Sequence, residues 1–260
     1  MSKVRPKKNL GQHFLKDRNI ARKIAYSLSG EGYSSVLEIG PGMGVLTGYL
    51  LERNFSDFKV IEIDNESVDY LMANMPEIGE IIRGDFLTFD LDKYFDSNFA
   101  IIGNFPYNIS SQIFFKILEH HNSVVEVCSM LQKEAAERIC APPGSRTYGI
   151  LSVLLQAYYS AELLFPVSSS VFYPPPKVQS AVIRLRRNQV ESLGCDEKLF
   201  FRVVKASFNQ RRKTLRNSVK AAFDLKRLDY PEFHLRPEQL SVDQFVELTN
   251  WVEGNLIVSE

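Results

Sequence analysis

The order of apolar segments constrains the fold of this 260-residue chain more than any other feature of its sequence. Through the first two thirds, apolar runs of strand length alternate with segments of helical periodicity. This alternation is typical of a parallel sheet with helices on both faces, and it predicts an α/β protein. The expected strands are Ser35–Ile39, Lys59–Ile63, Glu80–Arg83, Ala100–Ile102 and Glu126–Leu131. The expected helices between them are Leu46–Glu52, Glu66–Met75 and Ser110–His121.

The pattern changes after Ile150–Ser160. Leu163–Phe165 and Ser180–Leu185 are typical of a late pair of strands on either side of a proline-rich loop, whose prolines cannot join a sheet ladder. Further on the pattern favours helices, and Leu199–Phe223 keeps helical periodicity throughout. We therefore expect two domains, a catalytic domain at 1–187 and a small helical domain at 188–260.

Composition and cysteine spacing exclude several classes of protein. The sequence has no run of eighteen apolar residues, and its basic N-terminus lacks the apolar stretch of a signal peptide. Cys128, Cys140 and Cys195 are far apart and match neither a disulfide framework nor a metal-binding pattern. We expect a cytoplasmic protein that does not enter a membrane and holds no metal.

Charge is distributed unevenly although the formal net charge is zero. Residues 1–23 hold eight Lys and Arg against one acid, and residues 198–227 hold ten against one. Such blocks can form local positive faces that bind nucleic acid. In the second block, helical periodicity places the basic residues opposite an apolar side formed by Phe208, Leu215 and Val219. The residues expected to contact RNA are Lys205, Arg211, Arg212, Lys213, Arg216 and Lys220.

A glycine-rich turn follows the first expected strand of the sheet. Gly40, Gly42 and Gly44 stand at alternate positions before a helix, and glycine lets a ligand approach bare backbone. Glu62 ends the next strand, where a carboxylate can bind both hydroxyls of a ribose. Dinucleotide-binding enzymes share this pattern, but their usual spacing is Gly-x-Gly-x-x-Gly.

Two carboxylates around this turn favour a nucleoside that carries a positive charge. Glu38 directly precedes the turn, where an acid favours the cationic amino acid end of a sulfonium ligand over a pyrophosphate. Asp85 follows the third expected strand and can accept a hydrogen bond from an adenine amino group. The turn and its acids therefore predict a site for S-adenosylmethionine.

The tetrapeptide Asn104-Phe105-Pro106-Tyr107 follows the fourth expected strand and matches the signature [Asn/Asp/Ser]-x-Pro-[Tyr/Phe] of amino-methyltransferases. An exocyclic adenine amine is a poor nucleophile, and positive charge builds on it as it attacks a methyl sulfonium. Two carbonyl oxygens that accept its N–H groups stabilise that charge. Asn104 can supply one oxygen, Pro106 can aim a neighbouring backbone carbonyl, and Tyr107 can stack on the base.

With these motifs the chain resembles the ribosomal RNA small-subunit adenine N6,N6-dimethyltransferases along nearly its whole length. Further matching segments are Asn9–Leu15, Val60–Asp64, Met130–Glu134 and Phe172–Ser180. The resemblance implies a class I S-adenosylmethionine-dependent methyltransferase with a Rossmann-like, mostly parallel seven-stranded sheet and a small C-terminal helical domain. The implied cofactor contacts come from His13, Leu15, Gly40, Glu62, Asp85 and Asn104.

The resemblance also implies a target and a way of holding it. Tyr107 and Phe172 would hold the target adenine between aromatic rings, and the target would be two adjacent adenines near the 3′ end of 16S ribosomal RNA, within a small ribosomal subunit or its precursor. We expect the enzyme to act there as a monomer. Two positions depart from the usual pattern, because relatives often have Asn in place of His13 and Leu in place of Phe105.

Three other functions compete with this interpretation. A large-subunit adenine methyltransferase of the antibiotic-resistance type shares both motifs, but the proline-rich segment Phe172–Ser180 and the Gly11–Leu15 approach favour the small-subunit enzyme. A ribosome-assembly or transcription factor that has lost catalysis would not need the intact Asn104–Tyr107 segment. A nicotinamide oxidoreductase would leave that segment unexplained.

Overall fold

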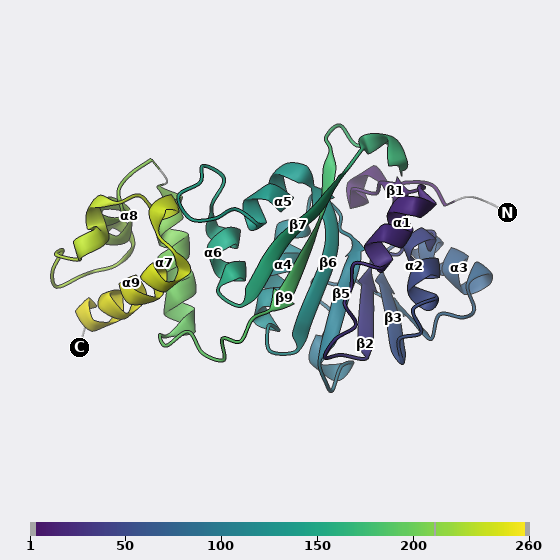
Figure 1. Cartoon of the computed structure of the whole chain (residues 1–260), viewed down its shortest axis with the longest axis horizontal. Coiled ribbons are helices and arrows are strands. Elements are labelled where there is room, and N and C mark those ends of the chain that lie inside the picture. Colours follow the sequence, from purple (N-terminus) through teal and green to yellow (C-terminus); the bar gives the residue numbers. More distant parts are fainter. Residues whose placement is uncertain (1–3, 211, 258–260) are drawn as a thin grey trace. The chain divides into compact units, whose positions relative to one another are not determined.

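A computed structural model describes residues 4–210 and 212–257. Its main sheet has seven strands in the order β4-β3-β2-β5-β6-β9-β7, and most of them lie side by side in Figure 1. The pairs among β4, β3, β2, β5 and β6 are parallel, whereas β9 runs antiparallel to β6. The expectation of a mostly parallel seven-stranded sheet is therefore confirmed. The strands are β2 Ser35–Ile39, β3 Asp57–Glu62, β4 Glu80–Arg83, β5 Phe99–Asn104, β6 Val124–Gln132, β7 Tyr159–Val167 and β9 Ser180–Arg187.

The central strands are buried on both faces, which explains why they appear in the sequence as continuous apolar runs. Every residue of β2 is buried, and Val36 belongs to one core cluster with residues of α1 Arg18–Ala25 and α2 Val45–Leu51. The other helices that follow the strands are α3 Asn65–Asn74, α4 Ser110–Glu119 and α5 Lys133–Ile139. Single 3-10 turns occur at Lys8–Leu10, Leu91–Lys93 and Ser169–Val171. No helix in the described part of the chain is long and apolar enough to cross a membrane.

A short second sheet joins the N-terminal segment to the proline-rich loop. Its strands β1 Phe14–Leu15 and β8 Phe172–Tyr173 are antiparallel, with Phe14 opposite Tyr173 and Leu15 opposite Phe172. In Figure 1 the purple N-terminal segment with β1 lies near the green connection between β7 and β9, which carries β8. This β1–β8 ribbon fixes the N-terminal segment against the main sheet.

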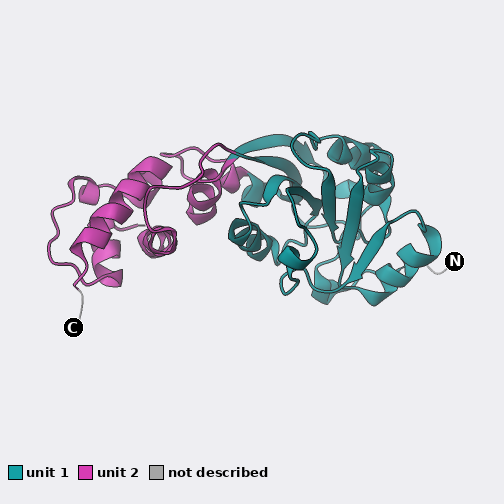
Figure 2. Cartoon of the chain, turned by 90° about the horizontal axis from the view of Figure 1, so that it is seen from below, with its two compact units in different colours: residues 1–136, 160–187 teal, residues 137–159, 188–260 magenta. Residues whose placement is uncertain are grey.

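The chain divides into two compact units, coloured in Figure 2. Unit 1 holds residues 1–136 and 160–187, and unit 2 holds residues 137–159 and 188–260. One division falls at the expected position after residue 187. The segment 137–159, expected in the catalytic domain, groups instead with the helical unit. This unit contains α6 Ile150–Gln156, α7 Glu197–Asn209, α8 Leu215–Ala222, α9 Val242–Asn255 and 3-10 turns at Pro231–His234 and Pro237–Gln239.

The single helix suggested for Leu199–Phe223 is wrong, because α7 ends at Asn209 and α8 begins only at Leu215. The apolar side is nevertheless buried as expected. Phe208 stacks on Phe245 of α9 with a centroid distance of 5.9 Å, and Leu215 and Val219 are fully buried. Lys205 therefore lies on a different helix from Arg216 and Lys220.

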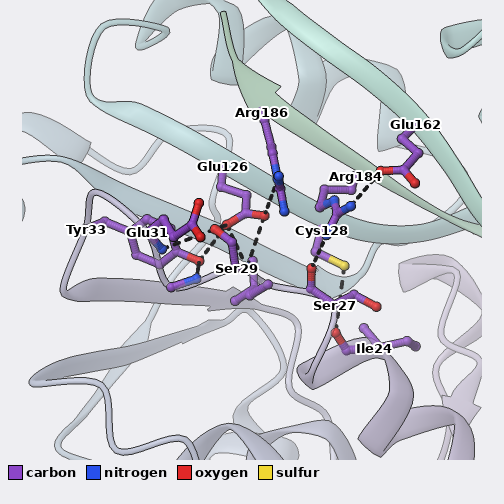
Figure 3. Close-up of polar contacts among 12 residues, drawn as sticks. Ile24, Ser27, Ser29, Glu31, Tyr33, Glu126, Cys128, Glu162, Arg184 and Arg186 are labelled. Atoms are coloured by element: carbon purple, nitrogen blue, oxygen red, sulfur yellow. Dashed lines mark hydrogen bonds and ion pairs between the residues drawn. The ribbon is translucent and has the colours of Figure 1, made fainter.

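A buried carboxylate anchors the loop between α1 and β2 (Figure 3). Glu126 of β6 is 2% exposed and accepts hydrogen bonds from the backbone N–H and the hydroxyl of Ser29, at 3.0 and 2.6 Å. It also accepts one from the Tyr33 hydroxyl at 2.7 Å and pairs with Arg186. Burial and the bond to Glu126 raise the pKa of the Tyr33 phenol, so it remains a donor.

Replacing Glu126 by alanine is expected to lower the free energy of unfolding by about 3 kcal/mol, because at least two hydrogen bonds to a charged group are lost and their partly buried donors lose their acceptor. Thermal or denaturant unfolding measures the change. Glu31→Ala removes an exposed carboxylate from the same loop and serves as the control. Equal stabilities of the two variants would show that the Glu126 bonds contribute nothing net.

Candidate active site

A cavity of about 250 Å³ opens where the carboxyl ends of β2, β3, β4 and β5 meet. Ligands bind at this edge in open α/β sheets. The walls come from five places in the sequence, and each holds a residue that the motifs had singled out. They are the segment Asn9–Phe14, the glycine turn, the end of β3 with Glu62 and Ile63, the Gly84–Leu87 loop and the Asn104–Ile109 segment. The fold thus brings together most of the predicted site residues.

The glycine turn separates this cavity from a smaller one of about 30 Å³, which is lined by Glu38 and Leu15 among others. Gly40, Gly42, Phe14 and Asn104 border both spaces. Gly40 has a φ of +66°, and a Cβ built on it would meet no atom within 4 Å. The turn therefore leaves open room at the junction, where a ligand can approach the backbone.

Glu62 is held in place from the protein side. It is 5% exposed, and its two oxygens accept the backbone N–H groups of Gly42 at 3.1 Å and Asp64 at 2.9 Å. Burial raises its pKa, and the backbone donors oppose this by favouring the charged form. Each carboxylate oxygen has a second lone pair, so Glu62 can still accept the hydroxyls of a ribose.

Glu38 is a buried acid that lacks a complete set of partners. It is 1% exposed, and its Oε2 has no hydrogen-bond partner among the described residues. Burial raises its pKa to about 8, an effect opposed by the Thr47 hydroxyl and increased by the nearby charge of Glu62. A buried carboxyl with an unsatisfied oxygen is costly, and a cationic group in the small cavity would satisfy it. The residues present therefore fit the charged amine of S-adenosylmethionine.

Asp85 lines the cavity and stabilises its own loop. Its Oδ1 accepts the backbone N–H of Leu87 at 2.9 Å, which fixes the turn after β4. The exposed side chain of Ile63 lines the same cavity and offers an apolar surface. The sequence motifs did not single out Ile63, although its position directly after Glu62 could have indicated it.

Asn104 and His13 are linked through the backbone. The Asn104 Nδ2 donates to the His13 carbonyl at 2.9 Å, which orients the amide so that Oδ1 is the atom free to accept. The Pro106 carbonyl accepts the N–H of Ile109 at 3.2 Å, whereas the Phe105 carbonyl accepts no hydrogen bond recorded from a described residue. Asn104 Oδ1 and the Phe105 carbonyl are therefore the two acceptors available at this wall.

The two departures from the usual pattern are accommodated. Because His13 contacts Asn104 through its carbonyl, that contact is independent of the side chain. The His13 ring instead lies 2.7 Å from the Pro174 carbonyl through Nδ1 and stacks on Tyr107 with a centroid distance of 5.5 Å. Phe105 is buried and packs against Phe114 of α4.

The two aromatic residues expected to hold the base differ in their positions. Tyr107 is half-buried in the cavity wall, and its hydroxyl lies 2.5 Å from Ser180 Oγ. Burial raises its pKa, so the phenol stays neutral. Phe172 is 1% exposed and belongs to the core cluster, as does its neighbour across the ribbon, Leu15. The Phe172 ring is therefore buried in this structure, and its stacking on the target adenine stays a prediction.

Sequence reasoning missed the contacts that fasten the N-terminal segment over the cavity. Asp64, the N-cap of α3, is 2% exposed and pairs with Lys7. It also accepts a hydrogen bond from Gln12 Nε2 at 3.0 Å and caps α3 through the N–H of Glu66. Burial opposes ionisation of Asp64, but these donors lower its pKa. Its sequence signals were its place after the second expected strand and within the matching segment Val60–Asp64.

Comparisons with known proteins identify the family of this chain. The profile of a family described as ribosomal RNA adenine dimethylase matches residues 3–253. A ribosomal RNA small subunit methyltransferase A of Parabacteroides distasonis is 60% identical over 252 residues, which cover 96% of this chain and 94% of the relative. A protein of the same name from Flavobacterium johnsoniae is 56% identical over 263 residues, covering both chains completely.

Solved structures show the same fold. A dimethyladenosine transferase from Plasmodium falciparum has a TM-score of 0.76 at 24% identity and covers 94% of this chain and 100% of its own. The 23S rRNA methyltransferase ErmE has a TM-score of 0.66 at 25% identity, covering 92% and 99%. The sequence motifs, the site that they form and the family profile lead to one conclusion. This chain belongs to the ribosomal RNA adenine dimethylase family.

Proposed function

We propose that this chain dimethylates N6 of two adjacent adenines near the 3′ end of 16S ribosomal RNA, with S-adenosylmethionine as the methyl donor. The observation that carries the proposal is the pair of acceptors at the cavity wall, Asn104 Oδ1 and the Phe105 carbonyl, beside the glycine turn. The enzyme would meet its RNA in a small ribosomal subunit or its precursor, in the cytoplasm and as a monomer.

The acids around the glycine turn would form the binding site of the methyl donor. Glu62 would bind the ribose hydroxyls, Asp85 the adenine amino group and Glu38 the cationic amine. The open room at Gly40 lies between these groups, next to Asn104. When bound, S-adenosylmethionine supplies an electrophilic methyl group on its sulfonium.

The acceptor side stabilises charge that develops on nitrogen. In the first of the two transfers, N6 of the target adenine would donate its two N–H groups to Asn104 Oδ1 and the Phe105 carbonyl. These acceptors are held rigidly, since the amide is oriented by His13 and the Pro106 turn is closed by Ile109. Acceptors already in place favour the transition state over the ground state. Tyr107 would stack on the base, which must leave its helical stack to reach the cavity.

The proposal is tested by locating the modified bases. Small subunits from a strain that lacks this protein should accept methyl groups from the purified enzyme at two adjacent adenines of 16S RNA, and dimethyladenine should be absent from that strain. Modification of large-subunit RNA would support the resistance-type activity instead. Unmodified RNA in both assays would support a factor without catalysis.

The raised pKa of Glu38 predicts how donor affinity depends on pH. Below about pH 8 the carboxyl is largely protonated and must lose its proton to pair with the ammonium group. The dissociation constant of S-adenosylmethionine should therefore fall up to about tenfold per pH unit as the pH rises towards 8, since one proton is released per ligand. Calorimetry between pH 6 and 8 measures this. In Glu38→Gln this dependence should disappear; a wild-type affinity independent of pH would contradict the role.

We propose RNA docking for the exposed basic residues of unit 2. Arg212 and Lys213 lie in the turn between α7 and α8, Arg216 and Lys220 share a face of α8, and Lys205 is exposed on α7. Arg211 lies outside the described residues. Phosphate contacts release counterions, so affinity should fall linearly with salt on a log–log plot.

Changing both Arg212 and Arg216 to Glu should weaken binding to small subunits. The slope of the log–log salt plot should become shallower by the amount that corresponds to about two phosphate contacts. The dissociation constant of S-adenosylmethionine should stay unchanged. Glu197→Lys, at the half-buried first residue of α7, changes the charge in the opposite sense and serves as a comparison. An unchanged slope in the double variant would mean that these residues are ordinary solvated surface.

A further inference from the structure

The β1–β8 ribbon carries an exposed aromatic side chain beside the catalytic cavity. Tyr173 is 61% exposed, whereas its cross-strand partner Phe14 is buried and lines both cavities. Residues directly opposite each other on antiparallel strands share a face and lie about 5 Å apart. Tyr173 is therefore on the face of the ribbon that carries Phe14 to the site.

The next residue in the chain ties this position to the catalytic wall. The Pro174 carbonyl lies 2.7 Å from Nδ1 of His13, whose ring stacks on Tyr107 and whose carbonyl orients Asn104. Three consecutive prolines after Tyr173 restrict the backbone and keep the turn stiff. Tyr173 is thus held in a fixed position one residue away from a contact with the active site.

Exposed cations surround the same ribbon. Lys16 follows β1 directly and donates its backbone N–H to the Val171 carbonyl at 2.9 Å, Arg18 begins α1, and Lys177 ends the proline turn. All three are exposed, and none forms a recorded ion pair with a described residue. The one acid among them, Asp17, uses its side chain to cap α1 at the N–H groups of Asn19 and Ile20. Cations interleaved with an exposed ring are typical of surfaces that bind unpaired nucleic acid.

We propose that Tyr173 is a binding site for the nucleotide that adjoins the target adenine, and that Lys16 and Lys177 hold the phosphates on either side of it. The inference rests on the proposed function. When the target base leaves its stack to enter the cavity, the neighbouring base loses a stacking partner. The Tyr173 ring replaces that partner, so the waiting adenine of an adjacent pair is kept next to the cavity.

The test compares Tyr173→Ala with wild type on small subunits from a strain that lacks the enzyme. KM for the subunits should rise about tenfold, a typical value for one lost stacking contact, with kcat within about twofold. The affinity for S-adenosylmethionine should not change. Tyr173→Phe keeps the ring and should restore the wild-type KM. Tyr94→Ala, which removes another exposed tyrosine ring of unit 1, is the matched control.

A second RNA separates base stacking from a general loss of fit. In subunits reconstituted with 16S RNA that has an abasic nucleotide beside the target, wild type and Tyr173→Ala should have the same KM. A KM unchanged by Tyr173→Ala on normal subunits overturns the proposal, and so does a tenfold rise that persists on the abasic RNA. If the wild-type enzyme methylates no adenine of the subunits, the proposed function itself fails and this inference falls with it.

Discussion

Replacing Asn104 by alanine is expected to slow methyl transfer about 10²–10³-fold, the cost of removing one fixed group that stabilises a transition-state charge. The amide oxygen accepts an N–H from a nitrogen that is neutral before attack and cationic afterwards. Its bond therefore strengthens along the reaction, and its loss should appear in kcat more than in KM. Single-turnover methylation of small subunits measures the effect directly.

A change to aspartate separates the two tasks of Asn104. Asn104→Asp keeps an acceptor for N6 but loses the Nδ2 donor to the His13 carbonyl, and places a negative oxygen near that carbonyl. We expect an intermediate rate, because the acceptor remains but is no longer held in position. Asn98→Ala, at an exposed position before β5, is the matched control. A near-normal rate of the Asn104→Ala enzyme would show that Asn104 takes no part in methyl transfer.

The main sheet could be predicted because each of its strands carries its own signal. Central parallel strands are buried on both faces, so β2 and β6 appear as apolar runs whatever lies around them. The glycine turn and the Asn104–Tyr107 segment each follow such a strand, and their approach in space follows from parallel pairing. The chemistry of the site was therefore accessible from local patterns.

The features that were missed depend on distant partners. The two-residue strands of the β1–β8 ribbon are too short for any periodicity, and they exist only because Phe14 and Tyr173 meet across the fold. The burial of Phe172 has the same origin, since an aromatic residue before prolines has no pattern that separates core from surface. The break between α7 and α8 contains neither Gly nor Pro, so periodicity continued across it unnoticed.

Replacing Glu62 by alanine is expected to raise the dissociation constant of S-adenosylmethionine by at least about 10²-fold. Two hydrogen bonds from ribose hydroxyls to a charged acceptor would be lost, and each contributes roughly 1.5–3 kcal/mol. The protein has already taken the carboxylate out of water and fixed it with the N–H groups of Gly42 and Asp64. Because the carboxylate is already ordered, ribose binding requires little further ordering of it. Loss of the two hydrogen bonds should therefore appear mainly as weaker affinity for S-adenosylmethionine.

Calorimetry must distinguish this loss from damage to the fold, because Glu62→Ala also leaves two backbone donors without their acceptor. Glu62→Gln retains the size and one carbonyl oxygen, so it can still accept one of the two backbone N–H groups. It should therefore weaken binding and lower stability less than alanine does. Glu77→Ala removes an exposed acid near β4 and should change neither quantity. When saturated with S-adenosylmethionine, the Glu62→Gln enzyme should recover much of the wild-type rate, because the ribose is remote from the attacked methyl group. Asn104→Ala should show the opposite behaviour, with an affinity for S-adenosylmethionine within about tenfold of wild type and a slow rate. An unaltered dissociation constant in a folded Glu62→Ala protein would place the donor elsewhere in the cavity.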